Sequence, residues 1–114
     1  MDDHHQSPIA CDMSVLSPQQ REAHLATSRE LFQKVQGVEE LGEGYRFRLD
    51  ADPHTIVSAA EFISLEKLCC PFLNFALEVD AEGGPVWLRL AGREGVKEFI
   101  REEISGILGT PLFS

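Results

Sequence analysis

The segment FALEVDAEGGPVWLRL, residues 75–90, decides the fold class. Each half alternates apolar and polar side chains with a period of two, which indicates a strand with one buried face. Between the halves, Gly83 and Gly84 supply the tip of a hairpin connection. The segment therefore predicts two antiparallel strands, over residues 75–79 and 86–90.

The rest of the chain adds helices and one more strand to this hairpin. Residues 45–49 alternate apolar and basic side chains and predict a third strand. Apolar residues recur at helical spacing in three segments. We expect one helix from Ser17 to about Gly37, one from Pro53 to Cys69, and one from about Arg93 to Gly109.

These elements predict a single α+β domain over residues 16–110, in the order α-β-α-β-β-α. Its three-stranded sheet should be mostly antiparallel, with the helices packed on one face. Residues 1–15 carry little periodic apolar pattern and are expected to form a disordered N-terminal tail. Residues 111–114 are expected to form a C-terminal tail.

The composition narrows the function classes. The 114-residue chain has a formal net charge of −9. Binding to nucleic acid or to an anionic membrane needs clustered cations, so neither is expected as a partner. No apolar run is long enough to span a bilayer, and residues 1–5 lack the features of a signal peptide. We expect a soluble, cytoplasmic protein.

The three cysteines carry the most specific chemistry. Their odd number, with Cys69 next to Cys70, is typical of free thiols in a reducing compartment. Adjacent cysteines form only a strained disulfide, but they can offer two thiolates to one soft ion. Hg(II), Zn(II), Cu(I) and As(III) are the candidates. Cys11 could supply a third donor.

The position of the pair favours metal capture over thiol catalysis. It lies at the C-terminal end of the predicted helix, where the helix dipole disfavours a thiolate. Glu66 precedes the pair by three and four residues, so its carboxylate would raise the thiol pKa values further. A coordinated soft cation overcomes this penalty, because it deprotonates the thiol outright.

The segment CCPF at residues 69–72 also carries a resemblance. Together with Glu66 and the segments 84–88 and 92–99, it resembles small uncharacterised prokaryotic proteins that share a Cys-Cys-Pro-Phe motif. Some of those are encoded among genes for resistance to mercury or other metals. The resemblance covers residues 43–100 and implies metal chemistry without any established activity.

A second candidate site lies on the other face of the predicted sheet. Its strands would carry Arg46, Arg48, Arg89 and Trp87, which together indicate either a site for an anionic ligand or an interface anchored by Arg and Trp. Pairing with Glu78 on a solvated face is the simpler interpretation. We interpret His24, and the acidic pairs at 39–40 and 102–103, as surface residues.

Three hypotheses follow. The leading one is a small thiol protein that binds a soft metal or metalloid ion through Cys69 and Cys70, assisted by Cys11 and Glu66. The alternative is a non-enzymatic homodimeric interaction module with structural cysteines. The third is a small thiol redox enzyme. We lean against an enzyme.

Overall fold

The computed structural model describes residues 7–111, in which four strands form one antiparallel sheet. The strands are β1 (Gly37–Glu40), β2 (Gly44–Leu49), β3 (Asn74–Val79) and β4 (Val86–Ala91), in the spatial order β1-β2-β4-β3. The predicted hairpin is confirmed as β3 and β4, with Leu77 opposite Leu88. β2 pairs with β4 on the other side.

The expectation of three strands is wrong, because the sequence reading missed β1. This strand has only four residues, and two of them are Glu39 and Glu40. Its stabilisation comes from the neighbouring strand: Glu39 lies opposite Arg46, whose Nε donates to Glu39 Oε1 at 2.7 Å. The element order of the described residues therefore has two consecutive strands after the first long helix.

The three long helices are α1 (Pro18–Gln33), α2 (Pro53–Cys69) and α3 (Val96–Leu108). α1 begins as predicted, at a capping box between Ser17 and Gln20. α2 has Asp52 as its N-cap, whose side chain accepts from the His54 N–H. α3 begins after Gly95, which has a φ of 95°, a conformation that L side chains rarely adopt. The expected start at Arg93 was therefore early.

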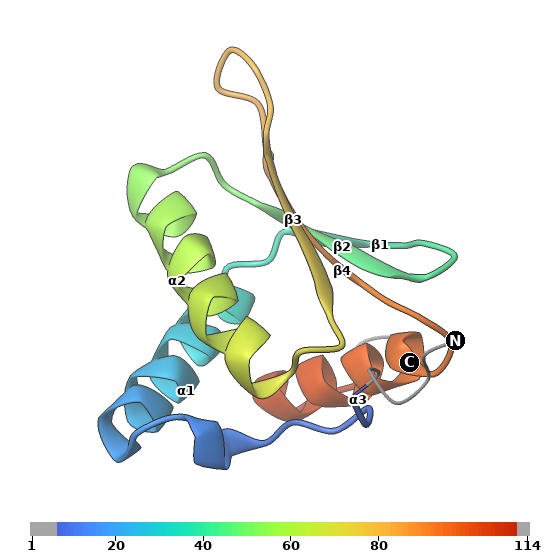
Figure 1. The fold of residues 1–114 in the computed structure, drawn as a ribbon. Helices are drawn as coiled ribbons and strands as arrows, with labels where there is room; N and C mark the ends of the chain where they lie inside the picture. Colours follow the sequence, from blue (N-terminus) through green and yellow to red (C-terminus); the bar gives the residue numbers. More distant parts are fainter. Residues whose placement is uncertain (1–6, 112–114) are drawn as a thin grey trace.

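All three helices lie on one face of the sheet, as expected (Figure 1). Inward side chains of β2 and β4 meet the helices in a core that includes Phe47, Leu88 and Ile100. Phe32 of α1 makes edge-to-face contacts with Phe47 of β2 and with Phe62 of α2. Full burial of one such side chain stabilises the fold by about 1.5–3 kcal/mol, so these layers fix how α1 and α2 lie.

The N-terminal segment is part of the domain, which corrects the expected boundary at residue 16. Met13–Val15 form a short 3-10 helix, η2, and Leu16 is buried. The Asp12 N–H donates to the Cys69 carbonyl at 2.8 Å. The expectation of a disordered tail is thus wrong for residues 7–15. Residues 1–6 and 112–114 lie outside the described residues.

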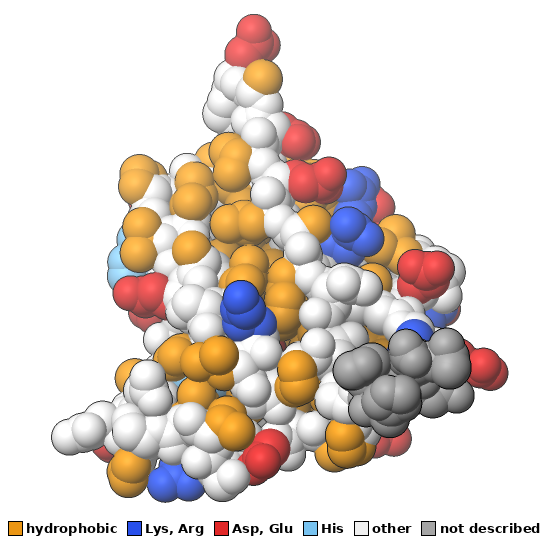
Figure 2. Space-filling view, in the orientation of Figure 1, with side chains coloured by type: hydrophobic (Ala, Val, Ile, Leu, Met, Phe, Trp, Pro, Cys, Tyr) orange, Lys and Arg blue, Asp and Glu red, His pale blue; other side chains and the backbone are white. Residues whose placement is uncertain are grey.

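The surface has two notable features. Acidic side chains gather at the tip of the β3–β4 hairpin, and hydrophobic side chains gather over α2 and beside β3 (Figure 2). Val57, Leu68 and Val79 are about half exposed there. Among residues 7–111, no helix has the length and apolar character that crossing a bilayer requires.

Candidate functional site

The cysteine pair lies where α2 ends against the N-terminal segment. Cys69 is the last residue of α2, and Cys70 is its C-cap, with its N–H donating to the Glu66 carbonyl at 2.8 Å. Pro71 follows, and it disfavours helical backbone at the residue before it. Both cysteines are fully buried. This placement at the C-terminal end of a helix is the one that the sequence predicted.

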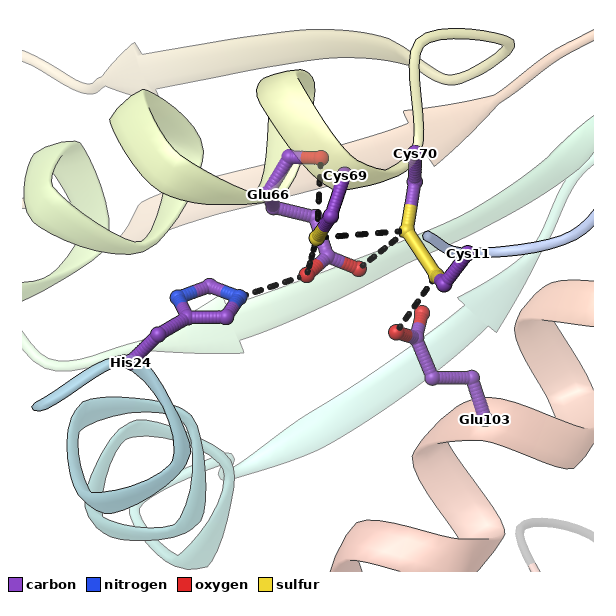
Figure 3. The surroundings of a disulfide bond; sticks show 6 residues. All are labelled: Cys11, His24, Glu66, Cys69, Cys70 and Glu103. Atoms are coloured by element: carbon purple, nitrogen blue, oxygen red, sulfur yellow. Dashed lines mark hydrogen bonds and ion pairs between the residues drawn. A yellow bond between two sulfur atoms is a disulfide. The ribbon is translucent and has the colours of Figure 1, made fainter. Parts of the chain in front are cut away.

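Cys70 forms a disulfide with Cys11, and Cys69 remains a free thiol (Figure 3). The expectation that all three thiols are free is therefore wrong for Cys11 and Cys70. The hydrogen bond from Asp12 to Cys69 brings the neighbouring Cys11 beside the end of α2, across a sequence separation of 59 residues. As expected, the two adjacent cysteines do not bond to each other, and their sulfur atoms are 3.8 Å apart.

Three polar side chains surround the sulfur atoms (Figure 3). Glu66 of α2 is buried, with Oε2 at 3.6 Å from Cys70 Sγ and Oε1 at 4.0 Å from Cys69 Sγ. His24 of α1 is also buried, and its Nε2 lies at hydrogen-bond distance, 2.7 Å, from Glu66 Oε1. Glu103 of α3 places Oε2 at 3.7 Å from Cys11 Sγ. All three long helices thus contribute to one cluster.

Burial shifts the pKa values of the ionisable groups of this cluster towards their neutral forms. Burial, followed by its interactions with Glu66, raises the pKa of Glu103 to about 9. Burial likewise raises the pKa of Glu66 and lowers that of His24. The pKa of the Cys69 thiol rises to about 12, through burial first and then the charges of Glu66 and Glu103. A bare thiolate at Cys69 is therefore disfavoured at neutral pH.

His24 and Glu103 were interpreted as surface residues, which is wrong for both. The helical spacing already contained the signal. His24 is four residues before Ser28, which is also buried, and Glu103 lies between Ile100 and Ile107 on the apolar stripe of α3. A polar residue at a buried position of a helical stripe indicates a buried polar site, because such a group needs a partner.

The donor atoms of these residues are close enough to share one ion. Cys11, Cys69 and Cys70 offer three sulfur atoms within 4.8 Å of one another. The same limit holds for the set of Cys11, Cys70, Glu66 and Glu103. A pocket of about 370 Å³ is lined by Cys11, His24, Glu66 and Glu103, whereas Cys69 and Cys70 are not among its lining residues. Access is therefore from the side of Cys11.

The predicted Arg and Trp face also forms, on the side of the sheet away from the helices. Arg46 lies opposite Arg89, and Arg48 lies opposite Trp87. The Arg46 guanidinium stacks 3.8 Å above the Trp87 ring, and it also pairs with Glu39 and Glu78. The charge of Arg46 is thus balanced within the chain, as the simpler interpretation expected.

Comparison of the chain with protein-family models, curated proteins and solved structures found no match. The resemblance to proteins with a Cys-Cys-Pro-Phe motif therefore stays a prediction.

Proposed function

We propose that the reduced chain captures a soft metal or metalloid ion with Cys11, Cys69 and Cys70. The observation that carries the proposal is that three sulfur atoms, from two distant parts of the chain, lie within 4.8 Å of one another beside a pocket. Thiolates prefer soft ions such as Zn(II) and Cu(I) over hard ones such as Mg(II). Glu66 and Glu103 would orient the thiols from the pocket side.

The spacing of the sulfur atoms suits an ion with bent bonds. Two thiolates bound to zinc at about 2.3 Å, with a tetrahedral angle between them, are separated by about 3.8 Å. Cys69 Sγ and Cys70 Sγ are already 3.8 Å apart. A linear ion at the same bond length would need sulfur atoms about 4.6 Å apart. The pair therefore favours trigonal or tetrahedral coordination.

Reduction of the disulfide is the first step of capture. A dithiol reductant transfers two electrons to the Cys11–Cys70 bond, giving two protein thiols and the disulfide of the reductant. The ion then replaces the thiol protons, which pass to solvent. Binding overcomes the raised pKa of Cys69, because a coordinated thiol is held as thiolate by the ion itself.

A thiol titration tests the proposal. The native protein is reduced with a phosphine, freed of reductant without air, and mixed with one equivalent of Cd(II), Hg(II), Zn(II) or arsenite. An aromatic disulfide reagent then counts the reactive thiols. At least one ion, at a ratio of one to one, should slow the reaction of all three thiols relative to the ion-free reduced chain, and C11S and C69S should lose this effect. S64A, at an exposed position of α2, is the matched control. A reaction that is equally fast with and without each of these ions would contradict the proposal.

Thiol–disulfide exchange is the second candidate, favoured by the disulfide itself. Cys69 Sγ lies 3.8 Å from the bonded sulfur of Cys70. Attack by a Cys69 thiolate would form the Cys69–Cys70 bond and release Cys11 as a thiolate. Two observations weigh against it: adjacent cysteines bond only with strain, and the pKa of Cys69 is raised to about 12. The ion-binding proposal needs neither a strained product nor a free thiolate.

A further inference from the structure

The number of sulfur atoms and the surrounding charge limit which ion the cluster can hold. We infer that the ligand is the neutral trihydroxide of a trivalent metalloid, arsenite or antimonite, which binds all three cysteines. This inference rests on the proposed function and names its ligand class.

The number of sulfur donors matches the coordination number of a trivalent metalloid. The cluster offers three sulfur atoms within 4.8 Å of one another. A trivalent arsenic or antimony atom carries a lone pair and forms three bonds directed to one side, so three thiolates complete its coordination. Structural zinc takes four ligands and would need His24 or a carboxylate in addition to the three sulfur atoms. Linear two-coordinate ions suit two sulfur atoms further apart than those of Cys69 and Cys70.

The net charge of the bound ion together with its thiolate ligands also disfavours a divalent ion. Zinc or cadmium with three thiolates carries a net charge of −1, and a carboxylate as fourth ligand makes it −2. Glu66 and Glu103 line the pocket beside this charge, and neither residue can supply a positive charge to balance it. Among the described residues that line the pocket, the permanent cation is Arg29, which is exposed. Because an uncompensated buried charge is costly, a divalent ion is disfavoured here.

A trivalent metalloid avoids that cost, because its three charges balance three thiolates. The trihydroxide is itself uncharged at neutral pH, so it can enter a negatively charged chain without repulsion. Its hydroxyl groups can hydrogen-bond to Glu66 and Glu103 as it passes them. The pocket of about 370 Å³ is large enough for a molecule of four heavy atoms.

The exchange balances without an oxidant. Three E–O bonds and three S–H bonds break, three E–S bonds form, and each hydroxyl group leaves with a thiol proton as water. E(OH)₃ and three protein thiols thus give E(S-Cys)₃ and three water molecules. The metalloid stays trivalent throughout. The only reductant needed is the one that first opens the Cys11–Cys70 disulfide.

Accurate mass of the intact complex tests the inference. The phosphine-reduced protein is mixed with sodium arsenite or with Cd(II) and sprayed from a volatile neutral buffer. The expected arsenic adduct contains one arsenic atom, has lost three hydrogens and keeps no oxygen. C11S should keep one hydroxyl group on arsenic and bind at least about tenfold more weakly. C11S changes a half-buried position, so circular dichroism should show it folded, and S64A should match the parent chain.

The outcomes separate the two claims. A three-thiol arsenic adduct that forms in competition with equimolar Cd(II) supports the inference. If Cd(II), Zn(II) or Hg(II) protects all three thiols but arsenite does not bind, or keeps a hydroxyl group on the parent chain, the metalloid inference is overturned and the proposed function stands. If none of these ions binds the reduced chain, both fail.

Discussion

Cys69 keeps its sulfur 3.8 Å from that of Cys70, although Cys70 is already bonded to Cys11. The chain therefore holds a third sulfur atom beside a complete disulfide. The free thiol of Cys69 takes no part in that bond. Once the disulfide is reduced, Cys69 completes a set of three sulfur donors.

The oxidation state of the chain should be visible in a thiol count. We expect no rapid reaction of the native, unreduced protein with a thiol reagent, because Cys69 is fully buried. One thiol should react after denaturation, and three after denaturation and reduction. Three reactive thiols without any reduction would show that the disulfide does not form in the protein as prepared.

The disulfide should stabilise the fold. It closes a loop across 59 residues of sequence, which corresponds to about 4 kcal/mol if its effect is entropic. Urea unfolding with and without a phosphine reductant measures this difference in free energy of unfolding. C11S should resemble the reduced parent chain and respond no further to the reductant. A midpoint that is equal in both conditions would mean that the bond contributes nothing to stability.

Stability should fall as the pH rises from about 5 to 9. In this window the folded chain keeps the Glu103 proton, whose pKa is about 9, while the unfolded chain has lost it near the ordinary value of 4.5. Folding therefore takes up a proton, and its free energy becomes less favourable with rising pH.

The variant Glu103→Gln tests whether Glu103 causes the fall in stability with rising pH. The neutral amide should remove a loss of stability of up to about 1.4 kcal/mol for each pH unit above about 5, and so flatten the pH profile. Urea unfolding at several pH values measures both effects. Glu102→Gln, at the exposed neighbouring position, is the control and should leave the profile unchanged. Equal profiles for the two variants would exclude Glu103 as the titrating group.

Substitutions on the outer face of the sheet test whether the chain forms the predicted homodimer. If two chains associate through this face, sedimentation velocity should show a dimer that dissociates on dilution. Trp87→Ala should weaken it at least about tenfold, because Trp and Arg dominate interface energetics. Val79→Ala, an exposed apolar position on the helix-bearing side of the sheet, is the matched control. A monomer at all concentrations would mean that Arg46 and Trp87 only stabilise the sheet.

Local patterns in the sequence were enough to predict most of the elements. The capping residues Ser17 and Asp52 and the turn at Gly83 each act within a few residues, so helix starts and the hairpin could be placed. β1 could not, because its stability comes from pairing with β2 rather than from its own four residues. The order of the strands in the sheet also depends on pairing between distant segments, so local patterns could not predict it.

The candidate site was predicted in part. Glu66 and the cysteine pair share one helix, so the spacing along α2 could bring them together. The disulfide to Cys11 depends on where the N-terminal segment crosses the end of α2, for which no local pattern exists. His24 and Glu103 were missed because the charged neighbours of Glu103, and the low apolar content around His24, made both helical positions resemble surface ones.

X-ray absorption at the arsenic edge tests the central claim most directly. Reduced protein with one equivalent of arsenite should show a first shell of three sulfur atoms and no oxygen. The same measurement at the cadmium edge tests sulfur ligation for a divalent ion. A first shell of oxygen or nitrogen alone, for both ions, would contradict the claim that Cys11, Cys69 and Cys70 form one ion-binding site.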